Sequence, residues 1–486
     1  MGSDESQPPF LPRVVSRGLE KNPKASSESH QLACRDDEPT IQAGTVEYKV
    51  YKRRFIGFTA LILLNIVGSW DWLTFAALSD TSAEYFKTSE TNVNWLCTVF
   101  LFAFAAFTPV VVWCMDRWGP KHSIVASAVL LIVGNWIRYL GTRINIFGIV
   151  MLGQILIGFS QPFFLSIPTK YSDMWFSERG RTSATAVVSL ANPLGGALGE
   201  LIDPALADKA HQVPNMVLYV SIISTILAAP SFFIPARPPT PPTPIVAQEK
   251  LPLVQSLKIL SKSFEFWVIW CAFSVYVGLF NAFSSVINSV FEPHGFSEDE
   301  SGIAGAALIF AGLAGAAVIS PITDRYKHYL ITVKILVPII AGSYLGMVWA
   351  PDCANVAAPY IICALTGASS IATLPVILEY TVEITYPIPP EVSSTLCWMG
   401  GQIMGAIIIV IDDALKAPKS ANPPENMTKS LIFQASIAGA LVPFPLMLGM
   451  FGRGSKLKNR RSDAEQLAHA SQPQKADDIE ASVQSA

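Results

Sequence analysis

Twenty consecutive residues without a charged side chain run as Ser301-Gly-Ile-Ala-Gly-Ala-Ala-Leu-Ile-Phe-Ala-Gly-Leu-Ala-Gly-Ala-Ala-Val-Ile-Ser320. A helix of about 20 mostly apolar residues is long enough to cross a lipid bilayer. Its many glycines and alanines would let a neighbouring helix backbone approach closely. The same is true of Gly195-Gly-Ala-Leu-Gly199. The pattern predicts transmembrane helices, and it leaves open whether the small residues serve static packing or a surface that slides.

Further apolar segments of similar length lie on both sides of this run, and together they make twelve. We predict transmembrane helices near 55–79, 92–114, 123–142, 147–170, 182–206, 214–235, 265–291, 302–321, 331–350, 357–380, 392–413 and 430–452. The composition agrees with a membrane protein. Hydrophobic residues make up 51% of the 486 residues and charged residues only 15%, whereas soluble domains carry about 25% charged residues.

A proline-rich connector divides these segments into two groups of six. It reads Arg237-Pro-Pro-Thr-Pro-Pro-Thr-Pro244, and such sequence forms a semi-rigid linker and not a helix. Six helices, a linker and six helices is the layout of two packed bundles. The expected parts are a disordered tail 1–50, a bundle 51–236, a linker 237–263, a bundle 264–453 and a disordered tail 454–486.

The distribution of basic residues predicts the orientation, because Lys and Arg collect in cytoplasmic loops. With a cytosolic N-terminus, most of them fall inside. The outside loops then hold only Lys87, Arg143, Lys209, Lys416, Lys419 and Lys429. Both termini are therefore expected in the cytosol. The sequon Asn426-Met-Thr428 falls in the last outside loop, which makes Asn426 a predicted glycosylation site.

Several function classes find no support. The seven cysteines show no metal-ligand spacing, and most lie in apolar runs where a thiol acts as a small hydrophobe. No phosphate-binding loop, dinucleotide fingerprint or nucleophile–base pattern is present. The net charge of −3 gives no reason to expect a nucleic-acid partner. We therefore expect no enzyme activity, no metal and no cofactor.

The loop between the second and third predicted helices reads Asp116-Arg-Trp-Gly-Pro-Lys121. It resembles the conserved loop of the major facilitator superfamily, in which an acid at a helix end holds basic groups in one conformational state. Asp324-Arg325 echoes it in the second half. We predict a conformational clamp, with Glu379 and Glu383 contacting basic loop groups. Its members are Asp116, Arg117, Gly119, Lys121, Asp324, Arg325, Glu379 and Glu383.

Three stretches resemble a narrower group, the feline leukaemia virus subgroup C receptor family of major facilitator transporters. They are Gly153-Gln-Ile-Leu-Ile-Gly158, Ala191-Asn-Pro-Leu-Gly195 and Glu379-Tyr-Thr-Val-Glu-Ile-Thr-Tyr-Pro387. The resemblance spans roughly residues 50 to 453. It implies the major-facilitator fold and transport of a small organic solute, for which choline, ethanolamine and haem have been proposed in different members.

The resemblance also implies a solute site. The tryptophan of the family's first helix matches Trp72, and the glutamine of its eleventh helix matches Gln402. Two positions depart from the choline-handling members. Pro193 replaces a glutamine and Asn281 replaces a tyrosine, so only half of an aromatic cage is expected.

Polar residues inside transmembrane helices are costly and need a reason. Beside Trp72 stands Asp71, and an acid with an indole suits an organic cation. Neighbouring helical residues point about 100° apart, however. Asp71 could instead pair with Arg138 or carry a proton. Asn192-Pro193 is expected to break its helix near a cavity.

The candidate solute-binding residues are Trp72, Gln402, Asn281, Asn192, Gln161 and Asp71. We expect a monomeric carrier of a small organic cation, zwitterion or haem-type solute, working by alternating access in the plasma membrane. The alternatives are a proton-coupled exporter of drugs or organic acids, using Asp71 or Glu200, and a membrane receptor or sensor that transports nothing.

Overall fold

The computed structural model describes residues 51–176, 178–240, 251–353, 356–449 and 460, with side chains at 173, 178–183 and 324 left out. The described residues belong to one compact unit. The predicted tail 1–50, nearly all of the tail 454–486 and part of the linker lie outside the described residues.

All regular secondary structure in the described residues is helical. The helices are α1 (Arg54–Leu73), α2 (Ser79–Phe86), α3 (Glu90–Arg117), α4 (Gly119–Arg143), α5 (Phe147–Trp175), α6 (Glu178–Leu206), α7 (Val213–Ala228), α8 (Leu253–Leu260), α9 (Phe264–Phe291), α10 (Glu298–Tyr326), α11 (Tyr329–Met347), α12 (Ala357–Thr385), α13 (Pro390–Leu415), α14 (Thr428–Leu441) and α15 (Pro443–Met447). Twelve segments are long and apolar enough to cross a membrane. The predicted all-α fold with twelve spanning helices is confirmed.

Local sequence signals explain where several helices begin. The Ser89 side chain accepts a hydrogen bond from the backbone N–H of Asn92 and caps α3. Ser297 and Glu300 form a reciprocal capping box at the start of α10. Such caps satisfy backbone donors that a helix start leaves free.

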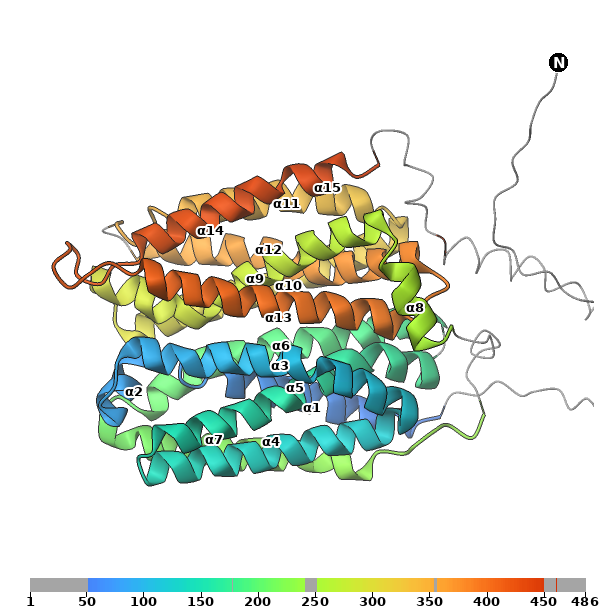
Figure 1. Ribbon diagram of the computed structural model, residues 1–486, viewed down its shortest axis with the longest axis horizontal. Helices are drawn as coiled ribbons and strands as arrows, with labels where there is room; N and C mark the ends of the chain where they lie inside the picture. Colours follow the sequence, from blue (N-terminus) through green and yellow to red (C-terminus); the bar gives the residue numbers. More distant parts are fainter. Residues whose placement is uncertain (1–50, 177, 241–250, 354–355, 450–459, 461–486) are drawn as a thin grey trace, which may run out of the picture. The chain divides into compact units, whose positions relative to one another are not determined.

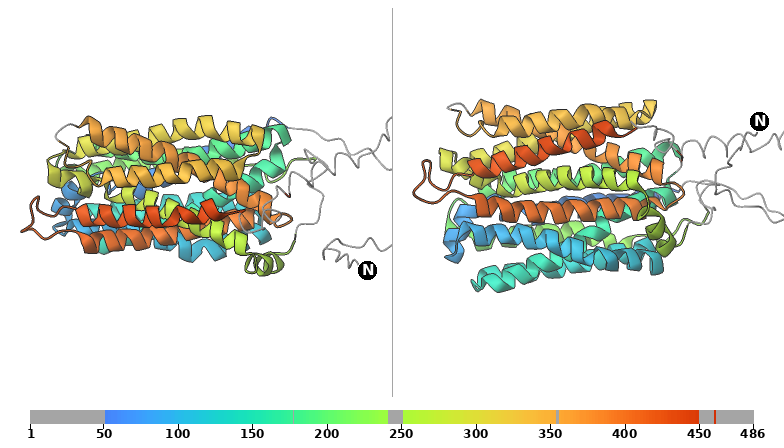
Figure 2. Two further views of the ribbon diagram at one scale, coloured as in Figure 1. Left: turned by 90° about the horizontal axis from the view of Figure 1, so that it is seen from above. Right: turned by 45° about the horizontal axis from the view of Figure 1, so that its top comes forward.

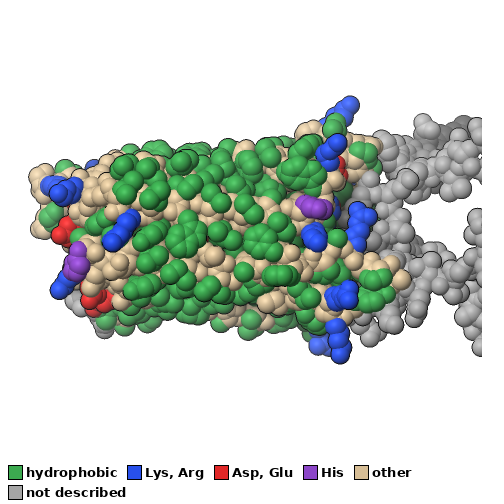
Figure 3. Space-filling view, turned by 90° about the horizontal axis from the view of Figure 1, so that it is seen from below, with side chains coloured by type: hydrophobic (Ala, Val, Ile, Leu, Met, Phe, Trp, Pro, Cys, Tyr) green, Lys and Arg blue, Asp and Glu red, His purple; other side chains and the backbone are tan. Residues whose placement is uncertain are grey.

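The long helices lie side by side along one common direction (Figures 1 and 2). The first half, α1 to α7, has its own hydrophobic clusters, and the second half, α9 to α15, supplies most of another large cluster. Hydrophobic side chains cover the broad middle of the surface in Figure 3, while charged ones gather toward the two ends. That distribution is the one expected for a protein surrounded by hydrocarbon.

Two short helices were not predicted. The first predicted span, 55–79, ends early because α1 stops at Leu73, and the chain then turns into the short α2. The other unpredicted helix is α8, which follows the proline-rich linker and lies at the linker end of the bundle (Figure 1). We call this end the linker end and the other the far end.

The small residues of α10 have two different neighbours. A Cβ added at Gly302 would lie 2.3 Å from the backbone oxygen of Glu200 on α6, in the other half. A Cβ at Gly315 would lie 2.6 Å from the backbone oxygen of Ala368 on α12, in the same half. The first part of the run therefore packs across the interface between the halves, and the later part packs inside one half.

Candidate functional site

A small central cavity lies between the two halves, about halfway along their helices. Its volume is about 30 Å³, which is enough for one or two water molecules. It is lined by Ser69, Trp72, Leu73, Gln161, Asn192, Pro193, Gly196, Val277, Phe280, Asn281, Ser284, Ile309, Leu374, Trp398 and Gln402. Five of the six predicted solute-binding residues are in this lining.

These residues come from helices that are far apart in the sequence. Trp72 lies near the end of α1 and stacks on Phe100 of α3, with ring centroids 6.3 Å apart. The Asn281 side-chain amide on α9 donates to Gln402 Oε1 on α13 at 3.0 Å. Asn192 donates to the backbone oxygen of Asn65 at 3.4 Å. The expected break at Asn192-Pro193 is wrong, because α6 continues through Pro193 as a helix.

Three fully buried polar atoms of the lining have no hydrogen-bond partner among the described residues. They are Trp72 Nε1, Gln161 Oε1 and Ser284 Oγ. All three side chains are buried, with exposed fractions of 5%, 2% and 3%. Unpaired buried polar groups are unfavourable, so a polar molecule that paired with them would be stabilised.

The central cavity also lacks a formal charge: none of the described lining residues is Asp, Glu, Lys or Arg. The sixth predicted residue, Asp71, does not contribute to the lining. It forms an ion pair with Arg138, with Asp71 Oδ1 2.9 Å from Arg138 Nη2 and both side chains fully buried. The structure therefore has the alternative pairing of Asp71 that the sequence had left open.

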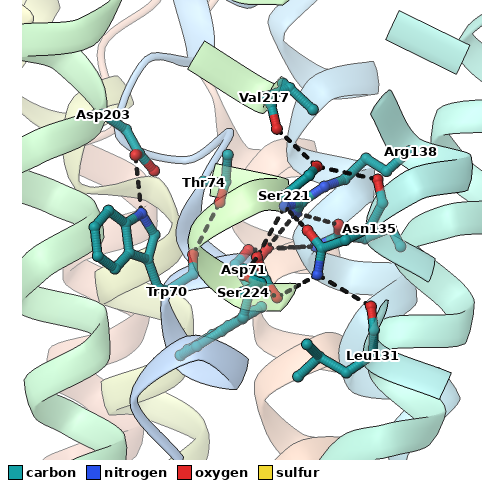
Figure 4. A network of polar contacts seen from close by, with 12 residues as sticks. Trp70, Asp71, Thr74, Leu131, Asn135, Arg138, Asp203, Val217, Ser221 and Ser224 are labelled. Atoms are coloured by element: carbon teal, nitrogen blue, oxygen red, sulfur yellow. Dashed lines mark hydrogen bonds and ion pairs between the residues drawn. The ribbon is translucent and has the colours of Figure 1, made fainter. Parts of the chain in front are cut away.

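Figure 4 shows the network around this ion pair inside the first half. Asn135 donates to Asp71 Oδ2 at 2.6 Å, and Ser224 of α7 donates to Oδ1 at 3.1 Å. Arg138 also donates to Gln154 Oε1 at 3.1 Å. With this many hydrogen bonds the buried pair is well compensated, and removing one partner would leave an uncompensated charge.

Two more acidic side chains, Glu200 and Asp203, lie nearby on α6. The Trp70 indole donates to Asp203 Oδ1 at 2.9 Å. Glu200, one turn earlier, is 1% exposed, and its two carboxyl oxygens have no partner among the described residues. Its carboxyl group faces Gly305 of α10, so it lies at the interface between the halves.

Polar contacts join the two halves at the far end, and we call these residues the far-end latch. The pairs are Thr81 Oγ1 to Glu298 Oε2 at 2.7 Å, Asn288 Nδ2 to Ser79 Oγ at 3.2 Å, Asn94 Nδ2 to Asp413 Oδ1 at 3.3 Å, Lys416 Nζ to Glu90 Oε2 at 2.5 Å, and Ser289 Oγ to Glu90 Oε1. Burial by itself lowers the pKa of Lys416, but the carboxylates of Glu90, Glu425 and Asp413 together outweigh it and raise that pKa.

The linker end is more open. A linker-end cavity of about 100 Å³ lies between the halves and includes Ser189, Glu379 and Ser394. A side cavity of about 390 Å³ lies near Asp116, beside the start of α8. An ion pair between the halves lies at this end, with Lys170 Nζ 4.0 Å from Glu391 Oε1.

The clamp residues remain a prediction. Asp116 and Arg117 are exposed, and Asp116 lines the side cavity. Glu379 lines the linker-end cavity, Glu383 is buried, and Arg325 lies over the Tyr326 ring at 6.0 Å. Gly119, the first residue of α4, has a positive φ of 77°, a conformation that suits glycine. Two members remain: Lys121 is half-buried near the start of α4, and the side chain of Asp324 lies outside the described residues.

Sequence reasoning missed two aromatic residues of the site, Phe280 and Trp398. Trp398 lines the central cavity and stands one helical turn before Gln402. Residues four apart lie on the same helix face, so this spacing could have identified Trp398.

The Asn426 side chain, the predicted glycosylation site, is half-buried and donates to the backbone oxygen of Pro423 at 2.7 Å.

The chain is similar to proteins of one superfamily. The sequence profile of the Major Facilitator Superfamily matches residues 60–409. Solute carrier family 49 member A3 of Danio rerio is 29% identical over 402 residues, covering 80% of this chain and 84% of that protein. The choline/ethanolamine transporter FLVCR1 of Mus musculus is 25% identical over 406 residues, covering 77% and 71%.

Solved structures share the fold. The xylose transporter XylE from E. coli, in a partially occluded inward open conformation, superposes with a TM-score of 0.60 at 11% identity, covering 82% of this chain and 98% of that one. The profile covers more than half of the sequence. The chain therefore belongs to the Major Facilitator Superfamily, as a multi-pass membrane transporter that resembles the feline leukaemia virus subgroup C receptor family.

Proposed function

We propose that this protein carries a small organic amine, either a choline-like cation or a zwitterion, across the membrane through the central cavity. The observation that supports this most is the convergence of Trp72, Gln161, Asn192, Asn281 and Gln402 on one cavity built by both halves. Relatives that are named choline/ethanolamine transporters support the same class of solute.

The chemistry of the lining fits such a solute. Indole faces attract organic cations by about 0.5–2 kcal/mol, and a quaternary ammonium needs no counter-ion for this contact. Trp72 and Trp398 supply two indoles. The unpartnered Gln161 Oε1 and Ser284 Oγ could bond a hydroxyl or amine group. A solute with a carboxylate group would find no Lys or Arg side chain among the described lining residues.

Alternating access is the proposed mechanism. The far-end latch closes one side of the central cavity, while larger cavities lie toward the linker end. A rocking motion of the halves that breaks the latch would expose the cavity to the far end. With the predicted orientation, the linker end is cytosolic and the far end faces outside. We further propose that the carrier works as a monomer in the plasma membrane.

Transport by purified protein in liposomes tests the function. A panel of labelled amines, with choline and ethanolamine included, would be followed for uptake into and efflux from the vesicles. We expect at least one amine to move faster than in empty liposomes, and Trp72→Ala and Gln402→Ala to slow it. The matched control is Trp95→Ala, because Trp95 is 39% exposed on the surface of α3.

Two outcomes would contradict the proposal. If no amine of the panel moved, the solute class would be wrong. If Trp72→Ala and Gln402→Ala carried every transported amine as fast as Trp95→Ala, the central cavity would not be the solute site.

A proton-coupled mechanism is the second candidate, and Glu200 is the specific observation that favours it. A carboxyl group with no partner, buried at an interface between moving halves, is a typical proton carrier in membrane transporters. Among the described residues, the ionisable groups that interact electrostatically with Glu200 are Asp203 on the same helix and Cys97 on α3. Coupling predicts that an uncoupler abolishes solute accumulation driven by a pH gradient and that Glu200→Gln has no such gradient-driven accumulation. Solute flux that is the same with and without the uncoupler, and in Glu200→Gln as in the unmodified protein, would exclude proton coupling.

A further inference from the structure

We propose that Trp398 is the gate between the central cavity and the linker-end cavity, as well as an aromatic wall of the solute site. This inference rests on the proposed function, since it concerns the path that the solute takes. Among the described residues, Trp398 alone belongs to the linings of both cavities.

The order of residues along α13 shows that the two cavities are stacked with Trp398 between them. Ser394, Trp398 and Gln402 follow each other at four-residue spacing, which places them on one face of the helix. Ser394 lines only the linker-end cavity, and Gln402 lines only the central cavity. Trp398 therefore stands at the boundary.

The other helices repeat this order. On α5, Gln161 lines the central cavity and Leu165 lines the linker-end cavity. On α6, Asn192 lines the central cavity and Ser189 the linker-end cavity. The boundary thus crosses both halves at one level, and Trp398 lies at it.

The contacts of Trp398 suit a gate. Its side chain is half-buried and packs against the hydrophobic clusters of both halves. Its ring meets the Phe273 ring edge to face, with centroids 5.5 Å apart. A side chain held only by apolar contacts can change rotamer without breaking a hydrogen-bond network, and such changes are fast.

The backbone of α13 is less free to move than this side chain. A Cβ at Gly400 would lie 2.1 Å from Ser274 Oγ, and a Cβ at Gly401 would lie 2.6 Å from Val277 Cγ1. These contacts hold α13 tightly against α9. Opening toward the linker end is therefore expected to need rotation of the indole and not separation of the two helices.

Cysteine accessibility tests the gate without any transported solute, so its outcome is independent of the solute class. Ser284→Cys places a thiol in the central cavity, and Ser189→Cys places one in the linker-end cavity. A membrane-impermeant thiol reagent is added from the linker side in inside-out vesicles. Each rate is corrected with the same protein lacking the introduced cysteine, because Trp398→Ala could also uncover the adjacent native Cys397.

Trp398→Ala should speed labelling of Ser284→Cys by about tenfold, which corresponds to removing a block of about 1.4 kcal/mol. Labelling of Ser189→Cys should not change. Trp270→Ala is the matched control, since Trp270 is half-buried beside the same helix, donates to the Leu396 backbone oxygen and lines neither cavity. It should leave both rates unchanged.

An unchanged rate for Ser284→Cys in Trp398→Ala, with Ser189→Cys still reactive, would overturn the gate. Trp398→Leu and Trp398→Phe provide the same comparison if the alanine variant does not fold. The solute site is tested separately by the liposome assay, because failed amine transport with faster labelling would reject the proposed function and keep the gate.

Discussion

Asp71 and Trp72 are neighbours in the sequence with different surroundings, because consecutive helical side chains point about 100° apart. Trp72 faces the central cavity between the halves, while Asp71 faces α4 and α7 within the first half. The sequence could indicate that one of them would turn away from a solute. It could not indicate which, because that depends on where Arg138 lies after folding.

Removing the cation of this buried pair should destabilise the protein. Arg138→Leu leaves Asp71 buried without its main partner, and breaking such a pair costs about 3–5 kcal/mol. We expect a clear drop in the thermal unfolding midpoint of the purified protein in detergent. Arg143→Leu is the control, because Arg143 is exposed at the end of the same helix.

The double variant Asp71→Asn with Arg138→Leu removes both charges, so it should regain part of the lost stability. If Arg138→Leu unfolded at the same temperature as Arg143→Leu, the ion pair would not be a stabilising element.

At the scale of elements, the small-residue run of α10 packs against two different helices, and whether any part of it slides stays a prediction. Gly302 meets α6 of the other half, and Gly315 meets α12 of its own half. The spacing of small residues predicted close helix contacts correctly. It could not assign them to neighbours, because every face of this helix is rich in glycine and alanine.

Alanine substitutions should therefore have different effects along α10. Gly315→Ala overpacks a permanent contact, and overpacking costs about 1–3 kcal/mol, so the thermal unfolding midpoint should fall. Gly302→Ala overpacks a contact that opening of the far end would relieve. It should instead raise the labelling of Ser284→Cys by a reagent added at the far end.

The control for both substitutions is Gly342→Ala on α11, where an added Cβ meets nothing within 4 Å. Equal stability losses for Gly302→Ala and Gly315→Ala, without any change in labelling, would argue that the whole run is a static contact.

Short elements were the part of the fold that the sequence did not predict. Hydrophobic length identifies helices that must span about 30 Å of hydrocarbon, and all twelve were found. It carries little information about α2 and α8, which are only 8 residues each. Both lie at ends of the bundle, where α2 brings Ser79 and Thr81 to the latch.

At the scale of the whole molecule, the two sides of the central cavity are closed by different means. The far end is held by several hydrogen bonds and an ion pair between the halves, whereas on the linker side Trp398 is the described residue that the linings of the linker-end cavity and the central cavity share. The sequence suggested the solute-site residues one at a time, each as a single polar or aromatic position in a different helix. It did not suggest the latch, whose partners are more than 200 residues apart for Thr81 and Glu298.

The ion pair of the latch should bias the protein toward the conformation closed at the far end. Lys416 is 13% exposed and bonded to Glu90, and its raised pKa keeps it charged through neutral pH. The contribution is therefore present at neutral pH and is lost only as pH rises through that raised pKa. Lys416→Met removes the pair at any pH, and a hydrogen bond to a charged group is worth about 1.5–3 kcal/mol.

We expect Lys416→Met to raise far-end labelling of Ser284→Cys by about tenfold or more, and to abolish the dependence of that labelling on strongly alkaline pH. Lys419→Met is the matched control, since Lys419 is 89% exposed and, among the described residues, forms an ion pair only with Glu425, at 3.7 Å. Equal labelling rates in the two methionine variants would show that Glu90 and Lys416 do not hold the far end closed. Closure would then depend on the apolar packing of α6 against α10, where Gly302 lies against the Glu200 backbone.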